Sequence, residues 1–240
     1  MTKFEHTKWA NSADAEEYRD NAEHYLPERR VLLSVITSFY RRFVAPLSSK
    51  RVLDLGCGDG IVAATLGSED SKMTICMVDG SADMVEAAKN RLSASPVEEV
   101  RCATFQQLIA GEVALGRFDF VVSGFAIHHL DLAEKRNLFH WVFDSLNSGS
   151  YFVNMDVVRP TSPVQEDWYY DLWREWIGRH QDENGLSKSF GHVPAEARRL
   201  PENFYDTLED QLDALRQVGF TDVECHYRYG LFGMYSGRSP

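Results

Sequence analysis

Apolar residues recur at helical spacing near the start of the chain, and the pattern then changes to short apolar runs alternating with amphipathic stretches. The first pattern predicts helical structure over residues 12–45, with a break near Pro27 and an end at Pro46. Proline lacks the amide hydrogen that a helix interior needs, so each proline interrupts a helix.

The alternation that follows predicts strands separated by helices. The predicted strands cover 51–56, 72–79, 97–105, 117–125 and 149–158. The predicted helices cover 60–67, 81–95, 105–114 and 132–147, and Ser81 is a natural N-cap for the second of them. Helices of this length between strands predict right-handed β-α-β units, and therefore a parallel sheet.

The alternation then ends. Residues 159–205 contain four prolines and the aromatic-rich segment WYYDLWREWIGRH, which predicts an inserted helix. A helix at 207–218 and strands at 221–229 and 231–238 follow. Because only one short turn, at Gly230, joins these strands, they are expected to pair antiparallel. The pattern as a whole predicts an α/β fold whose mostly parallel sheet ends in an antiparallel hairpin.

The composition of the chain limits which partners and which cellular location are expected. The chain of 240 residues is 44% apolar, enough for a sizeable core, and its net charge of -11 argues against a surface that follows a polyanionic backbone. A nucleic-acid partner is therefore not expected. The start of the chain has no apolar stretch typical of a signal peptide, and no later run could span a bilayer. A cytoplasmic protein, as a monomer or a homodimer, is expected.

The four cysteines have no paired spacing, which predicts reduced thiols and no metal site. They are Cys57, Cys76, Cys102 and Cys225.

The stretch RVLDLGCGDG, residues 51–60, predicts a strand that runs into a tight glycine turn at which backbone approaches a ligand closely. The spacing is wrong for a dinucleotide fingerprint, because Ile61 stands where G-x-G-x-x-G requires its last glycine. Asp54 would repel a phosphate, and no G-K-[ST] follows, so a P-loop is excluded.

Four segments in order resemble the motifs of class I S-adenosylmethionine-dependent methyltransferases. They are VLDLGCGDG, MVDGS, FDFVVSGFAIHHL and LNSGSYFVNMDVV. The resemblance extends from about residue 12 to 238 and implies a Rossmann-like sheet of seven strands, mostly parallel with an antiparallel last strand, helices on both faces and a helical lid insertion. It implies one domain over 1–240, with N-terminal helices (12–45), a core (50–158), the lid (159–205) and a C-terminal helix and hairpin (206–238).

The resemblance also implies S-adenosylmethionine as cofactor and S-adenosylhomocysteine as product. Asp54 suits the cationic amino end of this cofactor, Gly56 and Gly58 let the backbone approach it, and Asp79 can accept both ribose hydroxyls. The alternative is that each aspartate only caps the helix after it. The implied cofactor residues are Tyr18, Asp54, Gly56, Cys57, Gly58, Asp79, Gly80, Ser81, Met84, Ala103, Thr104, Phe105 and Ser123.

Thr104 departs from the family pattern, which usually has an acid there to accept from the adenine amino group. A threonine hydroxyl accepts more weakly, so this departure bears on cofactor affinity.

Methyl transfer is a direct displacement, and a base is needed only where the nucleophile carries a proton. His128 and His129, just beyond the fourth core strand, are the candidate catalytic residues. The alternative for either histidine is a packing role within the fold. Asp156, at the end of the fifth strand, is a candidate substrate contact, or else satisfies backbone donors there.

The aromatic segment adds substrate-binding candidates, Tyr169 and Trp173. With Trp176 they follow the spacing i, i+4, i+7 and are predicted to share one helix face. That face either closes over the substrate as a lid or docks onto the sheet as ordinary core.

Three functions remain open. The first is methyl transfer to N, O or C of a small molecule. The second follows from AEEY, LPE and YRYGLFGMYSGR, which resemble a bacterial branch that includes the carboxy-S-adenosylmethionine synthases of tRNA wobble-uridine modification. It requires a cation beside the extra carboxylate of the cofactor, and the resemblance places Arg198 or Arg199 in roughly the right region. The alternative is that both arginines are solvated on a helix. The third is a non-catalytic cofactor-binding module.

Overall fold

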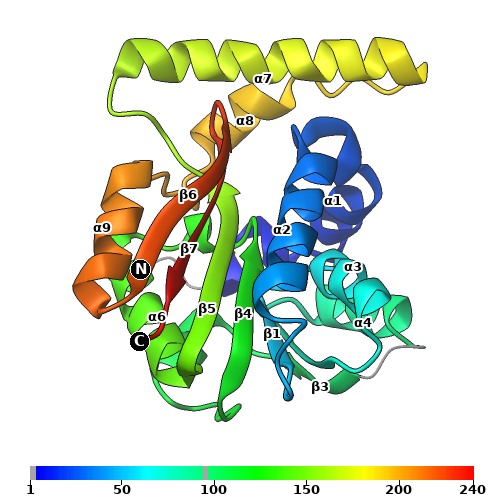
Figure 1. Cartoon of the computed structure of the whole chain (residues 1–240). Helices are drawn as coiled ribbons and strands as arrows, with labels where there is room; N and C mark the ends of the chain where they lie inside the picture. Colours follow the sequence, from blue (N-terminus) through cyan, green and yellow to red (C-terminus); the bar gives the residue numbers. More distant parts are fainter. Residues whose placement is uncertain (1–3, 94–96) are drawn as a thin grey trace.

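A single mixed sheet organises the molecule. The computed structural model describes residues 4–93 and 97–240, and in these residues the sheet has the strand order β3-β2-β1-β4-β5-β7-β6 (Figure 1). The strands are β1 (Arg51–Leu55), β2 (Thr74–Asp79), β3 (Val97–Cys102), β4 (Phe118–Gly124), β5 (Leu146–Val157), β6 (Thr221–Tyr229) and β7 (Phe232–Arg238). Strands β1 to β5 pair in parallel, whereas β7 runs antiparallel to both of its neighbours. The predicted fold class is confirmed.

Helices cover both faces of the sheet. They are α1 (Ser12–Tyr25), α2 (Arg29–Phe43), α3 (Ile61–Glu69), α4 (Ala82–Arg91), α5 (Phe105–Ile109), α6 (Leu132–Ser145), α7 (Pro163–Asn184), α8 (Val193–Arg199) and α9 (Leu208–Val218). Short 3-10 turns lie at Phe4–His6, Lys8–Ala10 and Ile127–His129. No helix in the described ranges is long and apolar enough to cross a membrane.

Alternating side chains of the strands build two cores. Val52 points into the core formed with α2, α3 and α4, whereas its neighbour Leu53 points into the core formed with α5, α6 and α9. This is the period of two expected of a strand that is buried on both faces. The cysteines are free thiols.

The structure corrects several predicted boundaries. The helical region 12–45 is two helices, with the break at Pro27 where it was expected. The predicted helix 105–114 is only the short α5, and α3 continues past Gly67. The helix predicted over 81–95 ends at Arg91, and its last two predicted residues lie outside the described ranges.

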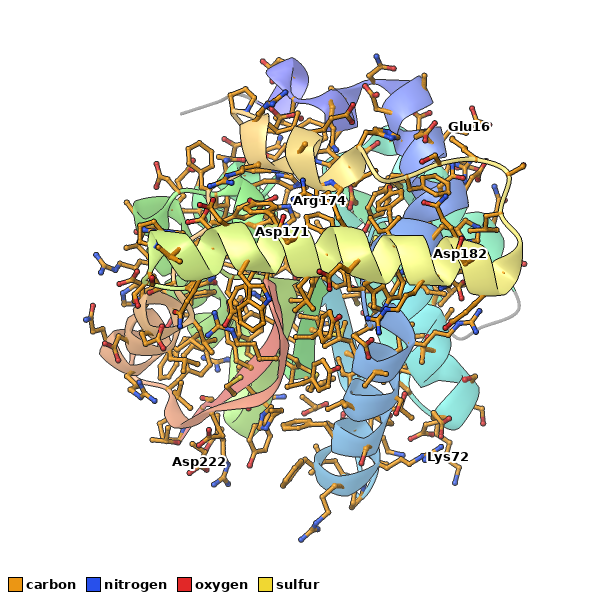
Figure 2. The ribbon with its side chains drawn as sticks, turned by 90° about the horizontal axis from the view of Figure 1, so that it is seen from above. Glu16, Lys72, Asp171, Arg174, Asp182 and Asp222 are labelled. Atoms are coloured by element: carbon orange, nitrogen blue, oxygen red, sulfur yellow. The ribbon has the colours of Figure 1, made fainter. Side chains whose placement is uncertain are left out.

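Helix α7 crosses the molecule above the carboxyl ends of the parallel strands (Figures 1 and 2). Pro163 begins the helix, where a missing amide hydrogen costs nothing, and Asp171, Arg174 and Asp182 are exposed along it. Its buried residues are Tyr170, Trp173 and Ile177. The predicted stripe of Tyr169, Trp173 and Trp176 packs against one apolar cluster, with Trp173 buried and the outer two members partly buried.

Candidate functional site

Two hollows surround the glycine turn at the carboxyl ends of β1, β2 and β4, and together they form what we call the inner pocket. One has a volume of about 110 Å³ and the other about 30 Å³. Eleven of the residues predicted to bind the cofactor line them, namely Tyr18, Asp54, Gly56, Cys57, Gly58, Asp79, Gly80, Met84, Ala103, Thr104 and Phe105. Both hollows include Tyr18 and the glycine turn, so they are parts of one elongated site.

Asp54, the last residue but one of β1, is fully buried. Its Oδ2 accepts a hydrogen bond of 3.0 Å from the Ala63 amide near the start of α3, so the aspartate does act as a helix cap. Its Oδ1 is buried without a hydrogen-bond partner among the described residues. Burial raises the pKa of Asp54 to about 8, because desolvation disfavours the carboxylate. One oxygen thus remains to bind a cationic ligand.

Asp79 connects the glycine turn to α4. Its Oδ2 accepts from the Gly58 amide and its Oδ1 from the Ser81 amide, each at 2.8 Å. These two hydrogen bonds oppose the effect of burial, which raises the pKa of Asp79. A carboxylate oxygen has two acceptor sites, so each oxygen can still accept from a ligand hydroxyl.

Gly56 shows why the turn requires glycine. Its φ of +69° lies in the left-handed region, and an added Cβ would lie 2.5 Å from the Cβ of Ala126. Neither the backbone conformation nor the space permits a side chain there.

Ser81 and Ser123 do not line the inner pocket. The Ser81 side chain accepts from the Met84 amide as the N-cap of α4, in agreement with the predicted cap. The Ser123 hydroxyl is fully buried and donates to the Leu55 carbonyl at 2.7 Å, which joins β4 to β1. Gly124 and Phe125 line the pocket in its place.

Phe125 is a site residue that sequence reasoning missed. Its φ is +56°, an unusual value for a side chain of this size, and its amide donates to the Met155 carbonyl at 2.7 Å. Backbone strain of this kind concentrates at functional sites. No residue pattern indicates a left-handed phenylalanine, so only the fold reveals it.

Thr104 borders the pocket as the N-cap of α5. It forms a capping box with Gln107, so its hydroxyl already accepts from the Gln107 amide at 3.3 Å. Gln106, which was not predicted, lines the pocket beside it and donates to Glu134 at 3.2 Å. An amide side chain therefore lies near the position where the family pattern usually has an acid.

A larger hollow, the outer cavity, has a volume of about 870 Å³. It lies against the inner pocket, and its lining comes from α1, α7, α8 and the segment after α8. Trp173 lines it, as predicted for a substrate contact. Tyr169 lies elsewhere: its ring packs beside Gly230 at the hairpin turn and beneath the Arg228 guanidinium, 5.5 Å from the ring centroid.

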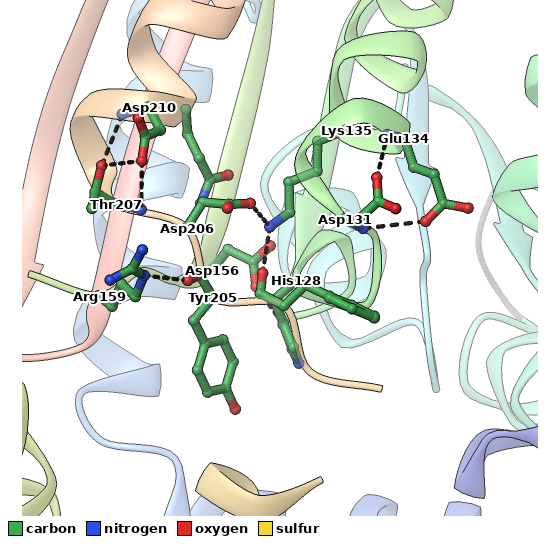
Figure 3. Close-up of polar contacts among 12 residues, drawn as sticks. His128, Asp131, Glu134, Lys135, Asp156, Arg159, Tyr205, Asp206, Thr207 and Asp210 are labelled. Carbon is green, nitrogen blue, oxygen red and sulfur yellow. Dashed lines mark hydrogen bonds and ion pairs between the residues drawn. The ribbon is translucent and has the colours of Figure 1, made fainter. Parts of the chain in front are cut away.

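His128 lines the outer cavity. Its imidazole is hydrogen-bonded to Asp156 (Figure 3). Its Nδ1 donates to Asp156 Oδ1 at 2.6 Å, which leaves Nε2 on the other side of the ring. Asp156 is fully buried and also accepts from the Val157 amide at 2.9 Å. The geometry gives Asp156 an orienting role in place of the predicted substrate contact.

His129 has a different environment. Its Nδ1 donates to the Glu202 carbonyl at 3.1 Å, and its Nε2 accepts from Trp9 Nε1 at 2.8 Å. Burial, reinforced by the neighbouring His128, lowers the pKa of His129 well below its usual range. With both nitrogens hydrogen-bonded and the ring neutral, His129 is not free to accept a proton from a substrate, contrary to its prediction as a catalytic residue.

The segment after α8 is fixed next to His128. Lys135, which is fully buried, donates to the Phe204 carbonyl and to Asp206 Oδ2, each at 2.5 Å, and Arg159 donates to the Tyr205 carbonyl at 2.7 Å (Figure 3). The Tyr205 ring lies 5.6 Å from the His128 ring between centroids, and both residues line the outer cavity.

The two arginines proposed for a carboxylated cofactor point to different places. Arg198 pairs with Asp167 at 2.7 Å and lies over the Tyr170 ring. Arg199 lines the outer cavity.

The part of the chain that contains this site is similar to known methyltransferases. Residues 53–152, which contain the glycine turn and both histidines, match a family described as methyltransferase domain. Among curated proteins, ribosomal RNA small subunit methyltransferase C of Citrobacter koseri is 33% identical over 123 residues, which are 50% of this chain and 32% of that protein. The chain thus spans about a third of the length of this relative.

Two further relatives match nearly the whole chain. Carboxy-S-adenosyl-L-methionine synthase of Actinobacillus pleuropneumoniae is 24% identical, and the match covers 91% of this chain and 88% of that protein. The structure of magnesium protoporphyrin IX methyltransferase from Synechocystis, with bound S-adenosylhomocysteine, has a TM-score of 0.65 at 11% identity and covers 97% and 96% of the two chains. Together with the ordered motifs and the reversed last strand, these similarities support a class I S-adenosylmethionine-dependent methyltransferase, and the structural match shows that the chain has the fold of such an enzyme.

Proposed function

We propose that the protein transfers a methyl group from S-adenosylmethionine to a small molecule whose reacting oxygen or nitrogen carries a proton. The observation that carries this proposal is the His128–Asp156 pair. A histidine oriented by a buried carboxylate faces a cavity that adjoins the inner pocket, and a general base is useful only where a proton leaves the nucleophile.

The residues of the inner pocket fit this cofactor. The unpartnered Asp54 Oδ1 suits the ammonium of the methionine end, and Arg29, which lines the same hollow, suits its carboxylate. Asp79 has acceptor capacity left for the ribose hydroxyls. Met84, Ala103 and Phe105 offer apolar surface for the adenine, and Gln106 offers a polar edge; these residues follow Asp79 in the chain.

The reaction then follows from the arrangement of the two hollows. The bound cofactor supplies an electrophilic methyl group on a sulfonium. His128 accepts the acceptor's proton at Nε2, and Asp156 stabilises the imidazolium that forms. General base catalysis of this kind contributes roughly 10²–10⁴-fold in rate. Most of the remaining catalysis comes from the alignment of the acceptor with the methyl group.

A small-molecule acceptor is supported by the cavity and the charge. A volume of about 870 Å³ lies within the range of ligand pockets, roughly 300–1,000 Å³. The net charge of -11 disfavours a surface that follows an RNA backbone. We propose that α7 and α8 enclose this acceptor, as the predicted lid.

A carboxy-S-adenosylmethionine synthase-like activity is the second candidate. One observation favours it: Arg199 lines the outer cavity, where a carboxylate next to the reacting centre would meet its guanidinium. Arg198 is engaged by Asp167 and does not line the cavity.

The proposal is tested by following the transfer of a labelled methyl group to an acceptor. The protein is incubated with methyl-labelled S-adenosylmethionine and, separately, with the small-molecule and RNA fractions of a bacterial extract. Label in the small-molecule fraction that is lost with His128→Asn supports the proposal. Label only in RNA contradicts the acceptor class, and a carboxylated nucleoside released from the denatured protein, identified by mass spectrometry, favours the second candidate.

A further inference from the structure

The inner pocket and the outer cavity meet at four residues, Trp9, Tyr18, Phe125 and His129, which line both hollows. We call Trp9, Tyr18 and Phe125 the aromatic collar. The Trp9 and Tyr18 rings pack edge to face with their centroids 5.0 Å apart. The collar rings therefore lie where the two hollows adjoin.

Trp9 is the collar member that the N-terminal segment supplies. Its indole Nε1 donates to His129 Nε2 at 2.8 Å, and the Lys8 amide, one residue earlier, donates to Glu202 Oε1 at 3.4 Å. Because the Glu202 carbonyl accepts from His129 Nδ1, it fixes the tautomer that leaves Nε2 as an acceptor for Trp9. His129 is therefore the residue that positions the indole.

The segment Phe4–Ala10 is also seated on the floor of the inner pocket. A Cβ on Gly80 would lie 2.6 Å from Cε2 of Phe4, so the absence of a side chain at Gly80 allows the phenyl ring to lie there. Phe4 and Thr7 line the inner pocket together with Trp9. Two separate contacts, one at Gly80 and one at His129, thus make this segment a wall of the pocket.

The Trp9 ring already accepts one cation in this structure, the ammonium of the adjacent Lys8. The Lys8 Nζ lies 4.7 Å from its centroid, within the range of a cation–π interaction. Indole is the aromatic side chain that binds cations best, and the interaction is strongest where water is excluded.

We propose that the aromatic collar binds the cationic centre of the cofactor at the junction of the two hollows, with Trp9 as a cofactor-binding residue and His129 as its positioning residue. This inference rests on the proposed function. It assigns the second histidine of the IHH turn a role next to the reaction centre that requires no proton transfer.

The test compares the dissociation constants of S-adenosylmethionine, which is cationic at sulfur, and S-adenosylhomocysteine, which is neutral there, by isothermal titration calorimetry. Trp9→Leu is expected to weaken S-adenosylmethionine by roughly 3–30-fold more than S-adenosylhomocysteine. Trp9→Phe keeps a ring and should retain part of this preference. His129→Leu removes the acceptor of the indole N–H and should lower the preference as Trp9→Leu does.

Trp168→Leu is the matched control, because Trp168 is 55% exposed on α7 and lines neither hollow. It should leave both constants unchanged. If Trp9→Leu folds, as judged by circular dichroism, and weakens both ligands equally or neither, the inference is overturned while the proposed function stands. If the wild-type protein binds neither ligand, the proposed function fails and the inference falls with it.

Discussion

The Nδ1 atom of His128 and the Oδ1 atom of Asp156 lie 2.6 Å apart at the carboxyl end of β5, and of the two residues only His128 lines the outer cavity. The carboxylate is itself held by the Val157 amide and by Asn154, so the ring has one defined orientation. The two adjacent histidines therefore have different hydrogen-bond environments, since both nitrogens of His129 are hydrogen-bonded, to Glu202 and Trp9.

Replacement of Asp156 by Asn should lower kcat for a hydroxyl or amine acceptor by roughly 10²–10³-fold, because the imidazolium loses its stabilising charge and its fixed tautomer. Binding of S-adenosylhomocysteine should stay within a few-fold of wild type, since Asp156 does not line the inner pocket. Steady-state kinetics measures kcat, and calorimetry measures the affinity for S-adenosylhomocysteine. An unchanged kcat would exclude His128 as a base.

Replacement of Asp54 by Asn should stabilise the cofactor-free protein and weaken S-adenosylhomocysteine binding. Folding raises the pKa of Asp54 from 3.8 to about 8, so the folded state binds a proton that the unfolded state releases between these values. Stability therefore falls as pH rises through this window in the wild type. The Asn variant lacks this loss, so its advantage in Tm should grow between pH 5 and pH 8.

Differential scanning fluorimetry without ligand measures this trend for both proteins. An advantage in Tm that is independent of pH would show that the Asp54 carboxyl is ionised throughout.

Replacement of Gly56 by Ala should destabilise the fold by about 1–3 kcal/mol and abolish cofactor binding. The new methyl group would clash with Ala126, and the φ of +69° is strained for alanine. Gly178→Ala, in the middle of α7 with open space around it, is the matched control and should be neutral or stabilising by up to about 1 kcal/mol. Urea unfolding compares them, and equal effects would contradict the account of the turn.

Replacement of Lys135 by Met should lower stability by about 3 kcal/mol, because Asp206 and the Phe204 carbonyl would lose a buried donor. For a chain of this size the Tm falls by roughly 6–12 °C. Lys89→Met, at an exposed ion pair with Glu86, should change the Tm only slightly. Thermal unfolding distinguishes the two, and a Lys135 variant as stable as the control would mean that the Tyr205 segment is held by other contacts.

The sequence predicted those parts of the molecule that depend on local patterns. Apolar runs predicted the positions of β1 to β5 along the chain and their parallel pairing, and the turn at Gly230 indicated the antiparallel hairpin. The glycine turn, Asp54 and Asp79 come together because they lie at the carboxyl ends of adjacent strands of a parallel sheet, which meet at one edge.

The residues that the sequence missed come from distant segments. Trp9 and Tyr205 reach the site from the N-terminal 3-10 turns and from the loop after α8, and neither lies in a motif. Ser123 was misplaced because a strand-end position does not reveal that its hydroxyl donates to Leu55. His128 and His129 are neighbours in sequence with opposite environments, which only tertiary hydrogen bonds decide.

The most direct measurement is calorimetric titration of S-adenosylhomocysteine into the wild-type protein and the Asp79→Asn variant at neutral pH. The account predicts one site per chain for the wild type and at least tenfold weaker binding for the variant, since the Asp79 carboxylate holds the turn and accepts from the ribose. Absence of binding to the wild type, or equal affinity in both proteins, would contradict a cofactor site at the glycine turn.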